Sequence, residues 1–229
     1  MTETQAQSSA SLRTILPRLF SRAQPAGSVE RLLRTVRSHH PKADLALVER
    51  AYRVAHKAHT GQTRKSGEPY ITHPVAVAQI LADLGIGAKT LAAALLHDTV
   101  EDTDYGLEEL RADFGDEVAG IVASCSDALG EPKPPWRDRK EAYLTHLREP
   151  DVDNAVLCVA LADKRHNSRC VLEDLHTQGA SAWDRFTVGS NEQLWWYGSL
   201  ADVFLERRPG RAAQELARTV AAIRELAGA

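Results

Sequence analysis

Four ionisable side chains stand within six positions at the end of an apolar segment. Residues 92–96 read AAALL, and His97, Asp98, Glu101 and Asp102 follow. Burying a carboxylate or a charged imidazole costs free energy unless the group is paired or bound to a cation. An apolar helix that ends in such residues therefore needs a partner for their charge.

Two other predicted helices carry ionisable residues in similar positions. In residues 154–175, side chains at steps of three and four share one face of a helix. That face combines apolar residues with a carboxylate and an amide, namely Val156, Val159, Ala160, Asp163 and Asn167. His73 stands directly before Pro74, where a helix can begin because proline lacks the N–H that the first turn leaves unpaired.

One divalent metal ion would compensate the cost of burying the ionisable side chains of all three helices. We expect the side chains to converge from three helices on such an ion, with His73, His97, Asp98 and Asp163 as its ligands. Two imidazoles and two carboxylates suit manganese, iron or zinc better than calcium. Glu101 and Asp102 lie one turn further on, where they could activate water or protonate a leaving group without binding the metal.

Each of these residues also has a simpler interpretation. A His–Asp pair occurs by chance, and a single core-facing Asp can be a helix cap or the partner of a cation. His73 before a proline can also be an ordinary loop residue. The prediction of a metal site rests on the conjunction of these residues and not on any one of them.

The elements that must position these residues are helical almost throughout. We predict helices over residues 44–60, 74–84, 88–98, 107–113, 116–127, 137–147, 154–175, 190–206 and 211–227. Residues 61–73 and 130–135 are rich in turn-forming residues and predict loops. No segment shows the alternation typical of a β-strand, so the fold class is all-α.

Composition limits the classes of protein and the partners that we expect. The chain has 229 residues and a net charge of −3, which disfavours nucleic acid as a partner. It has no apolar run of about 20 residues that could cross a membrane, and three cysteines without metal-ligand spacing indicate reduced thiols and a cytoplasmic protein. Residues 1–28 predict a flexible leader, and residues 29–229 a single domain.

Three motifs, in order and spacing, resemble a known family. They are HTGQTRKSGEPYITHPVAVAQILADLG at 59–85, LLHDTVEDT at 95–103 and LADKRHNSR at 161–169. Together they are similar to the HD-type hydrolase domain of the RelA/SpoT homologue proteins, which act on the alarmones ppGpp and pppGpp. The resemblance covers roughly residues 32–176. It implies an HD-domain helical bundle with a C-terminal helical extension, and the chain length resembles that of stand-alone small alarmone hydrolases.

The resemblance also implies an activity and roles for named residues. It places Mn²⁺ on the four ligands already selected, although other divalent metals have the same ligand preference, and it assigns Glu101 and Asp102 to the attacking water. Arg64 would stack on the guanine ring, Lys65 and Ser66 would approach the phosphates or the ribose, and Asn167 would contact the nucleotide. The implied reaction is hydrolysis of the 3′-pyrophosphate of (p)ppGpp, which yields pyrophosphate and GDP or GTP.

Some residues depart from the family pattern. Arg165 stands where an apolar residue is usual, Cys170 stands where Thr is frequent, and residues 125–147 differ from the usual segment. These departures leave two alternatives: an HD phosphohydrolase acting on another nucleotide, such as NADPH or a different purine phosphate, and a non-catalytic regulator that binds alarmones. The sequence does not indicate an oligomeric state.

Overall fold

A computed structural model describes residues 28–127 and 132–228 of the chain. The leader predicted for residues 1–28 lies outside the described residues except for Ser28. This residue caps the first helix, because its side chain accepts a hydrogen bond from the backbone N–H of Arg31.

The fold is all-α, as predicted. The helices are α1 (Val29–His39), α2 (Leu45–Ala58), α3 (Thr72–Asp83), α4 (Ala88–Leu96), α5 (Thr99–Asp102), α6 (Leu107–Cys125), α7 (Trp136–Arg148), α8 (Asn154–Gln178), the 3-10 helix η1 (Gly179–Arg185), α9 (Ser190–Arg207) and α10 (Arg211–Ala227). Over the described ranges, the only β pairing is a single bridge between Thr63 and Pro69. None of the helices in these ranges is long and apolar enough to span a membrane.

The helices differ from the predicted ones at three main points, and one predicted break is present. The sequence prediction did not include α1. Helix α3 begins at Thr72, so His73 lies within its first turn and not before it. The segment predicted as one helix over 88–98 ends at Leu96, and α5 follows as a separate turn. Gly115 interrupts α6 with a φ of 82°, as the predicted break between 113 and 116 requires, because this backbone conformation favours glycine.

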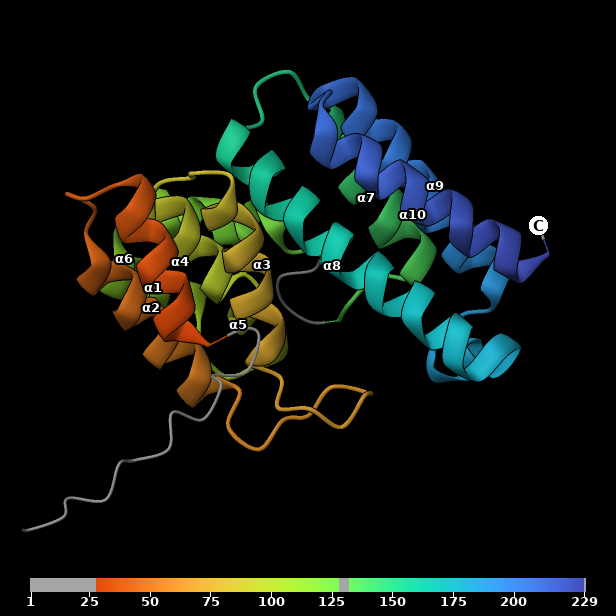
Figure 1. Ribbon diagram of the computed structural model, residues 1–229, viewed down its shortest axis with the longest axis horizontal. Coiled ribbons are helices and arrows are strands. Elements are labelled where there is room, and N and C mark those ends of the chain that lie inside the picture. Colours follow the sequence, from red (N-terminus) through yellow and green to blue (C-terminus); the bar gives the residue numbers. More distant parts are fainter. Residues whose placement is uncertain (1–27, 128–131, 229) are drawn as a thin grey trace, which may run out of the picture.

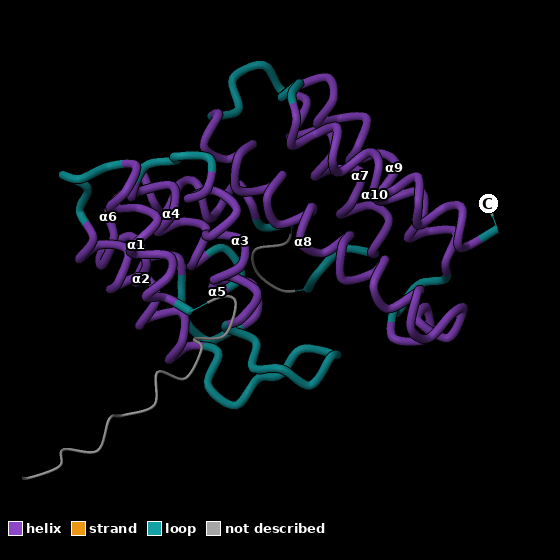
Figure 2. The backbone as a smooth tube through the Cα atoms, viewed as in Figure 1, coloured by secondary structure: helices purple, strands orange, loops and turns teal. Residues whose placement is uncertain are grey.

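Helix α8 is the central element of the arrangement. In Figure 1 it runs between a group formed by α1 to α6 and a group formed by α7, α9 and α10. It packs against α3 on one side and against α9 and α10 on the other. Figure 2 shows the segment between α2 and α3 as a long loop that projects from the helices. This loop carries Arg64, Lys65 and Ser66.

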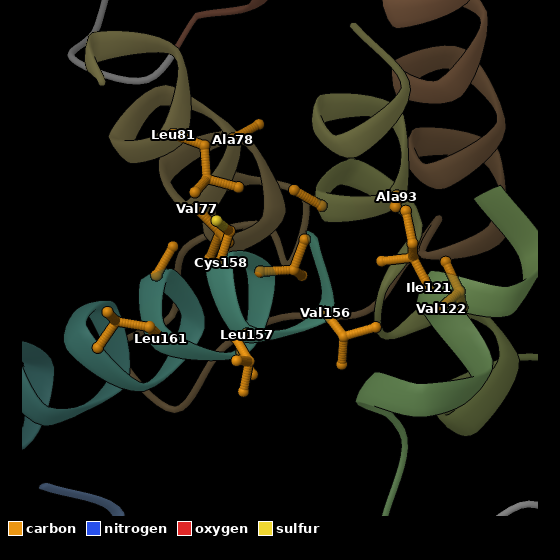
Figure 3. Packing of buried hydrophobic residues seen from close by; sticks show 14 of the residues in the cluster. Val77, Ala78, Leu81, Ala93, Ile121, Val122, Val156, Leu157, Cys158 and Leu161 are labelled. Carbon is orange, nitrogen blue, oxygen red and sulfur yellow. The ribbon is translucent and has the colours of Figure 1, made fainter. Parts of the chain in front are cut away.

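Small side chains let the helices around the site approach one another closely. Ala92, Ala93 and Ala94 of α4 are fully buried. Figure 3 shows Ala93 beside Ile121 and Val122 of α6, and the same view shows residues of α3 above residues of α8, namely Val77, Leu81, Cys158 and Leu161. This close packing brings the end of α4, the start of α3 and the middle of α8 together.

Candidate metal centre and active site

His97 is the best-oriented of the predicted ligands. It lies where α4 ends and α5 has not yet begun, and it is 5% exposed. Its Nδ1–H donates to the carbonyl of Ala94 at 2.8 Å, so Nε2 is turned toward the carboxylates. This Nε2 atom is buried and forms no well-aligned hydrogen bond with the described residues, although oxygens of Asp98 and Asp163 lie 3.2 Å and 3.6 Å away. A buried polar atom without a partner costs free energy, and coordination to a cation would supply the missing interaction.

His73 points toward the same place from the first turn of α3. It is 3% exposed, and its Nε2 lies 3.1 Å from Oδ1 of Asp163 and 3.5 Å from Oδ2 of Asp98. Its other nitrogen, Nδ1, lies 2.9 Å from Nδ1 of His166. One nitrogen of this pair must donate and the other must accept. Burial lowers the pKa of His166 to about 3, so its ring is neutral at physiological pH.

The two aspartates complete the cluster and have hydrogen-bond partners of their own. Asp98 Oδ2 accepts from the Tyr70 hydroxyl at 2.7 Å. Asp163 accepts from Lys164 at 2.7 Å and from the amide of Asn167 at 2.6 Å. Burial alone would raise the pKa of Asp163, but Lys164 and the imidazoles outweigh it and lower the pKa well below the usual range. Burial would also raise the pKa of Asp98, but His97 and His73 outweigh it and lower that pKa, so both aspartates carry negative charge.

These four residues form a cluster suited to a divalent cation. One ligand atom each from His73, His97 and Asp163 lie within 4.8 Å of one another. The oxygens of Asp98 lie 3.5 Å from His73 Nε2 and 3.2 Å from His97 Nε2. Burial lowers the pKa of His97, but Asp98 and Asp163 outweigh that effect and raise it to about 9. The negative charges of Asp98 and Asp163 would also attract a metal cation.

Glu101 and Asp102 lie on α5, the short turn that follows Asp98. Burial, together with the charges of Asp127 and Asp102, raises the pKa of Glu101 to about 7. Asp102 is held in place because Oδ2 accepts from the Tyr70 hydroxyl at 3.1 Å and its carbonyl accepts from Gln62 at 2.9 Å. A carboxyl group that exchanges its proton near neutral pH can act as a general acid or a general base.

The loop between α2 and α3 places three of the four predicted substrate-binding residues on one wall of the site. The guanidinium of Arg64 approaches Cys170 Sγ at 3.9 Å, and its buried Nη1 has no hydrogen-bond partner among the described residues. Lys65 donates to the carbonyl of Arg185 and lies 5.2 Å from the centroid of the Phe186 ring. Ser66 lies on the same wall. Asn167 is also on this cavity, but its amide donates to Asp163.

One cavity joins all of these groups. Its volume is about 860 Å³, within the range of small-molecule sites. It is lined by every predicted site residue, by Lys140 and Trp196, and by residues that the sequence prediction did not include, among them Tyr70, Tyr143, Lys164 and His166. Of these, His166 could have been recognised, because it lies one helical turn beyond Asp163 and shares its face. The others depend on contacts between segments distant in sequence.

The all-α fold and its buried cluster of two histidines and two aspartates define a helical protein with a candidate site for a divalent metal ion. Residues 51–188 match the family described as HD domain, and the chain belongs to this family.

Similar proteins confirm the resemblance to the RelA/SpoT homologues. The chain is 48% identical to a GTP pyrophosphokinase of Streptomyces coelicolor over 167 residues, which are 71% of this chain and 20% of the relative. It is 42% identical to the bifunctional (p)ppGpp synthase/hydrolase SpoT of Escherichia coli K12 over 144 residues, which are 61% of this chain and 20% of that protein. The chain thus spans about a fifth of the length of these relatives.

Two solved structures share the fold. The crystal structure of lmo0812 from Listeria monocytogenes EGD-e is 32% identical, with a TM-score of 0.57, and the match covers 69% of this chain and 98% of that one. A metazoan orthologue of SpoT, described as hydrolysing ppGpp, is 24% identical with a TM-score of 0.61, and the match covers 80% of this chain and 96% of that one. At this identity, the second likeness supports the fold alone.

Proposed function

We propose that the protein is a Mn²⁺-dependent hydrolase that removes the 3′-pyrophosphate from (p)ppGpp and yields pyrophosphate and GDP or GTP. The observation that carries this proposal is the buried His/Asp cluster, which opens on a nucleotide-sized cavity beside Glu101. The names of the similar proteins, among them a SpoT that is both synthase and hydrolase, support guanine alarmones as the substrate class.

In this proposal His73, His97, Asp98 and Asp163 hold the metal ion. The ion would act as a Lewis acid that activates water and stabilises negative charge on phosphoryl oxygens. Figure 1 places the helices that supply these ligands, α3, α4 and α8, next to one another. The N/O ligand set fits Mn²⁺ and also other transition metals.

The remaining residues would bind the substrate and transfer protons. Glu101, whose pKa is about 7, would accept the proton of the attacking water or donate a proton to the departing 3′-oxygen. Asp102, held by Tyr70, would orient that water. A planar guanidinium such as Arg64 stacks on a nucleobase better than an ammonium does. Lys65, Ser66 and Asn167 would contact the phosphates, the ribose or the base.

The direct test measures pyrophosphate release from ppGpp by the purified protein, with Mn²⁺ and with EDTA. We expect release, with GDP as the second product, only when Mn²⁺ is present. His97→Ala, Asp163→Ala and Glu101→Gln should each abolish it, and all three should retain a cooperative thermal transition. Release that survives in His97→Ala would contradict the proposed centre.

One observation supports a second candidate substrate. The segment 125–147, which departs from the family pattern, contributes Cys125, Asp127, Trp136, Lys140 and Tyr143 to the cavity wall. An HD phosphohydrolase acting on another nucleotide, such as NADPH, would fit this difference. Metal-dependent phosphate release from that nucleotide, without turnover of ppGpp, would identify it. Binding of ppGpp without turnover of any nucleotide would instead indicate a non-catalytic regulator.

A further inference from the structure

A buried imidazole lies behind the active site and does not line its cavity. His59 follows the last residue of α2 as its C-cap, at the start of the loop that carries Arg64, and it is 3% exposed. Its Nε2 atom is buried and forms no hydrogen bond with the described residues. A buried polar atom without a partner costs free energy, so an apolar side chain would serve the packing at this position better. The imidazole of His59 therefore indicates a role other than packing.

The first contact of His59 leads through Gln62 to Asp102. The amide nitrogen Nε2 of Gln62 donates to the backbone carbonyl of Asp102 at 2.9 Å. The other atom of this amide, the oxygen Oε1, therefore faces Nδ1 of His59 at 2.8 Å and accepts its hydrogen. The backbone supports the same arrangement, because the N–H of Gln62 donates to the carbonyl of His59 at 3.0 Å. These bonds connect His59 to the end of α5 through a single residue.

The second contact of His59 leads through Tyr70 to both aspartates beside α5. The rings of His59 and Tyr70 are stacked, with centroids 4.4 Å apart and 21° between their planes. The hydroxyl of Tyr70 donates to Oδ2 of Asp98 at 2.7 Å and lies 3.1 Å from Oδ2 of Asp102. A ring packed on the face of Tyr70 restricts the direction in which this hydroxyl points. His59 thus supports the group that holds both carboxylates.

We propose that His59 is a positioning residue, which acts through Gln62 on Asp102 and through Tyr70 on Asp98. Neither His59 nor Gln62 lines the cavity, so this role involves no contact with the substrate. The inference rests on the proposed function, in which Asp98 binds the metal ion and Asp102 orients the attacking water. Loss of outer partners of this kind typically lowers metal affinity or activity by about 10–100-fold.

Two substitutions of His59 separate its two contacts. His59→Phe keeps a ring that can stack on Tyr70 but has no N–H for Gln62, whereas His59→Asn keeps an N–H donor and loses the ring. We expect His59→Phe to lower kcat for ppGpp by about tenfold with KM within about twofold of the wild type, because Asp102 does not bind the substrate. In a calorimetric titration, His59→Asn should weaken Mn²⁺ binding by about tenfold, and His59→Phe should keep it within about twofold.

Gln62→Met tests the first contact without changing a core position, because Gln62 is half-buried and methionine has a similar length. It removes both hydrogen bonds of the amide and should lower kcat by the same factor as His59→Phe. The double variant should be no slower than either single variant, because the two residues act as one connected unit. Factors that multiply in the double variant would show independent roles and would overturn the connection from His59 to Asp102.

The matched control is His56→Ala, which removes an imidazole one turn earlier on α2. His56 is exposed, and its ring lies beside Tyr52, with centroids 5.8 Å apart. This variant should keep kcat and Mn²⁺ affinity within about twofold of the wild type. The thermal midpoint of His59→Phe should equal or exceed that of the wild type, because the substitution removes a buried nitrogen without a partner. A lower midpoint with unchanged kcat would show that His59 only stabilises the fold and would overturn the proposal.

The Mn²⁺ titration requires no turnover, so it distinguishes failure of the positioning role from failure of the proposed function. His59→Asn combined with Tyr70→Phe should weaken Mn²⁺ binding no more than Tyr70→Phe alone, because both changes act on the same hydroxyl. If the wild type binds Mn²⁺ without hydrolysing ppGpp, this non-additivity still supports the role of His59, and the proposed reaction alone fails. Hydrolysis of ppGpp with equal kcat in wild type, His59→Phe and Gln62→Met would overturn the positioning role and leave the hydrolase proposal standing.

Discussion

Removal of divalent metal ions should lower the thermal stability of this protein. The cluster brings two carboxylates and two imidazoles together in the interior, with His73 3% and His97 5% exposed. A cation that binds only the folded chain at about 100 times its Kd stabilises it by about 2.7 kcal/mol. In a chain of this size each kcal/mol shifts the midpoint by about 2–4 °C, so saturation with Mn²⁺ should raise Tm by about 5–11 °C.

Differential scanning calorimetry of the metal-free protein, titrated with Mn²⁺ and reversed with EDTA, measures this shift. His97→Ala and Asp163→Asn should remove the response, because each deletes one of the clustered ligand atoms. The control is His146→Ala. His146 lines a separate acidic cavity of about 370 Å³ with Glu149 and Asp151, where cations could bind nonspecifically.

The quantity to compare is the change in Tm that Mn²⁺ causes in each variant. The absolute Tm is not comparable, because the substitutions also change the stability of the metal-free protein. A wild-type midpoint that is indifferent to Mn²⁺ would refute the metal centre. A shift of equal size in His97→Ala would show that the ion binds elsewhere. A shift lost in His146→Ala and kept in His97→Ala would place it in the acidic cavity.

Three further predictions concern acid–base chemistry, ligand orientation and packing. Burial, followed by the charge of Asp127, raises the pKa of Glu101 to about 7. Asp127→Asn should therefore lower this pKa and move the limb of the pH–kcat profile that reports Glu101 toward lower pH. A limb that does not move would show that another group titrates there. If Glu101 acts as the base, that limb is the acidic one. Tyr70→Phe removes the hydroxyl that bonds Asp98 and should weaken Mn²⁺ binding by about 10–100-fold in a calorimetric titration, whereas equal affinity would show that the hydrogen bond does not orient the ligand. Phe204→Ala, at a fully buried position of α9, should cost about 3–5 kcal/mol in urea denaturation with little change in Mn²⁺ affinity.

Helical periodicity explains why much of the site could be predicted from the sequence. The steps of three and four in residues 154–175 placed Asp163 on the core face of a helix, and the structure buries it at 5% exposure. The apolar run before His97 likewise placed that imidazole at the end of a buried helix. Both inferences depend only on local spacing and on the cost of burying charge.

The residues that the sequence did not reveal depend on tertiary contacts. Tyr70 bonds Asp98 and Asp102 across a loop, and no local pattern relates these positions. Lys164 follows Asp163 directly, but its place against Trp196 arises only when α9 packs on α8. The start of α3 was misplaced because Pro74 marks a favoured first position but does not exclude an earlier turn.

The order of the proposed metal ligands along the chain has a consequence for how the protein folds. His73 and His97 lie in the first half of the sequence, whereas Asp163 lies on α8, after α6 and α7 have been made. A nascent chain therefore cannot close the cluster until α8 leaves the ribosome and docks against α3. Because such distant contacts form late and the proposed ion would need all four proposed ligands, Mn²⁺ should slow unfolding far more than it speeds folding. Tight metal binding would thus report that α8 has docked against α3 and α4.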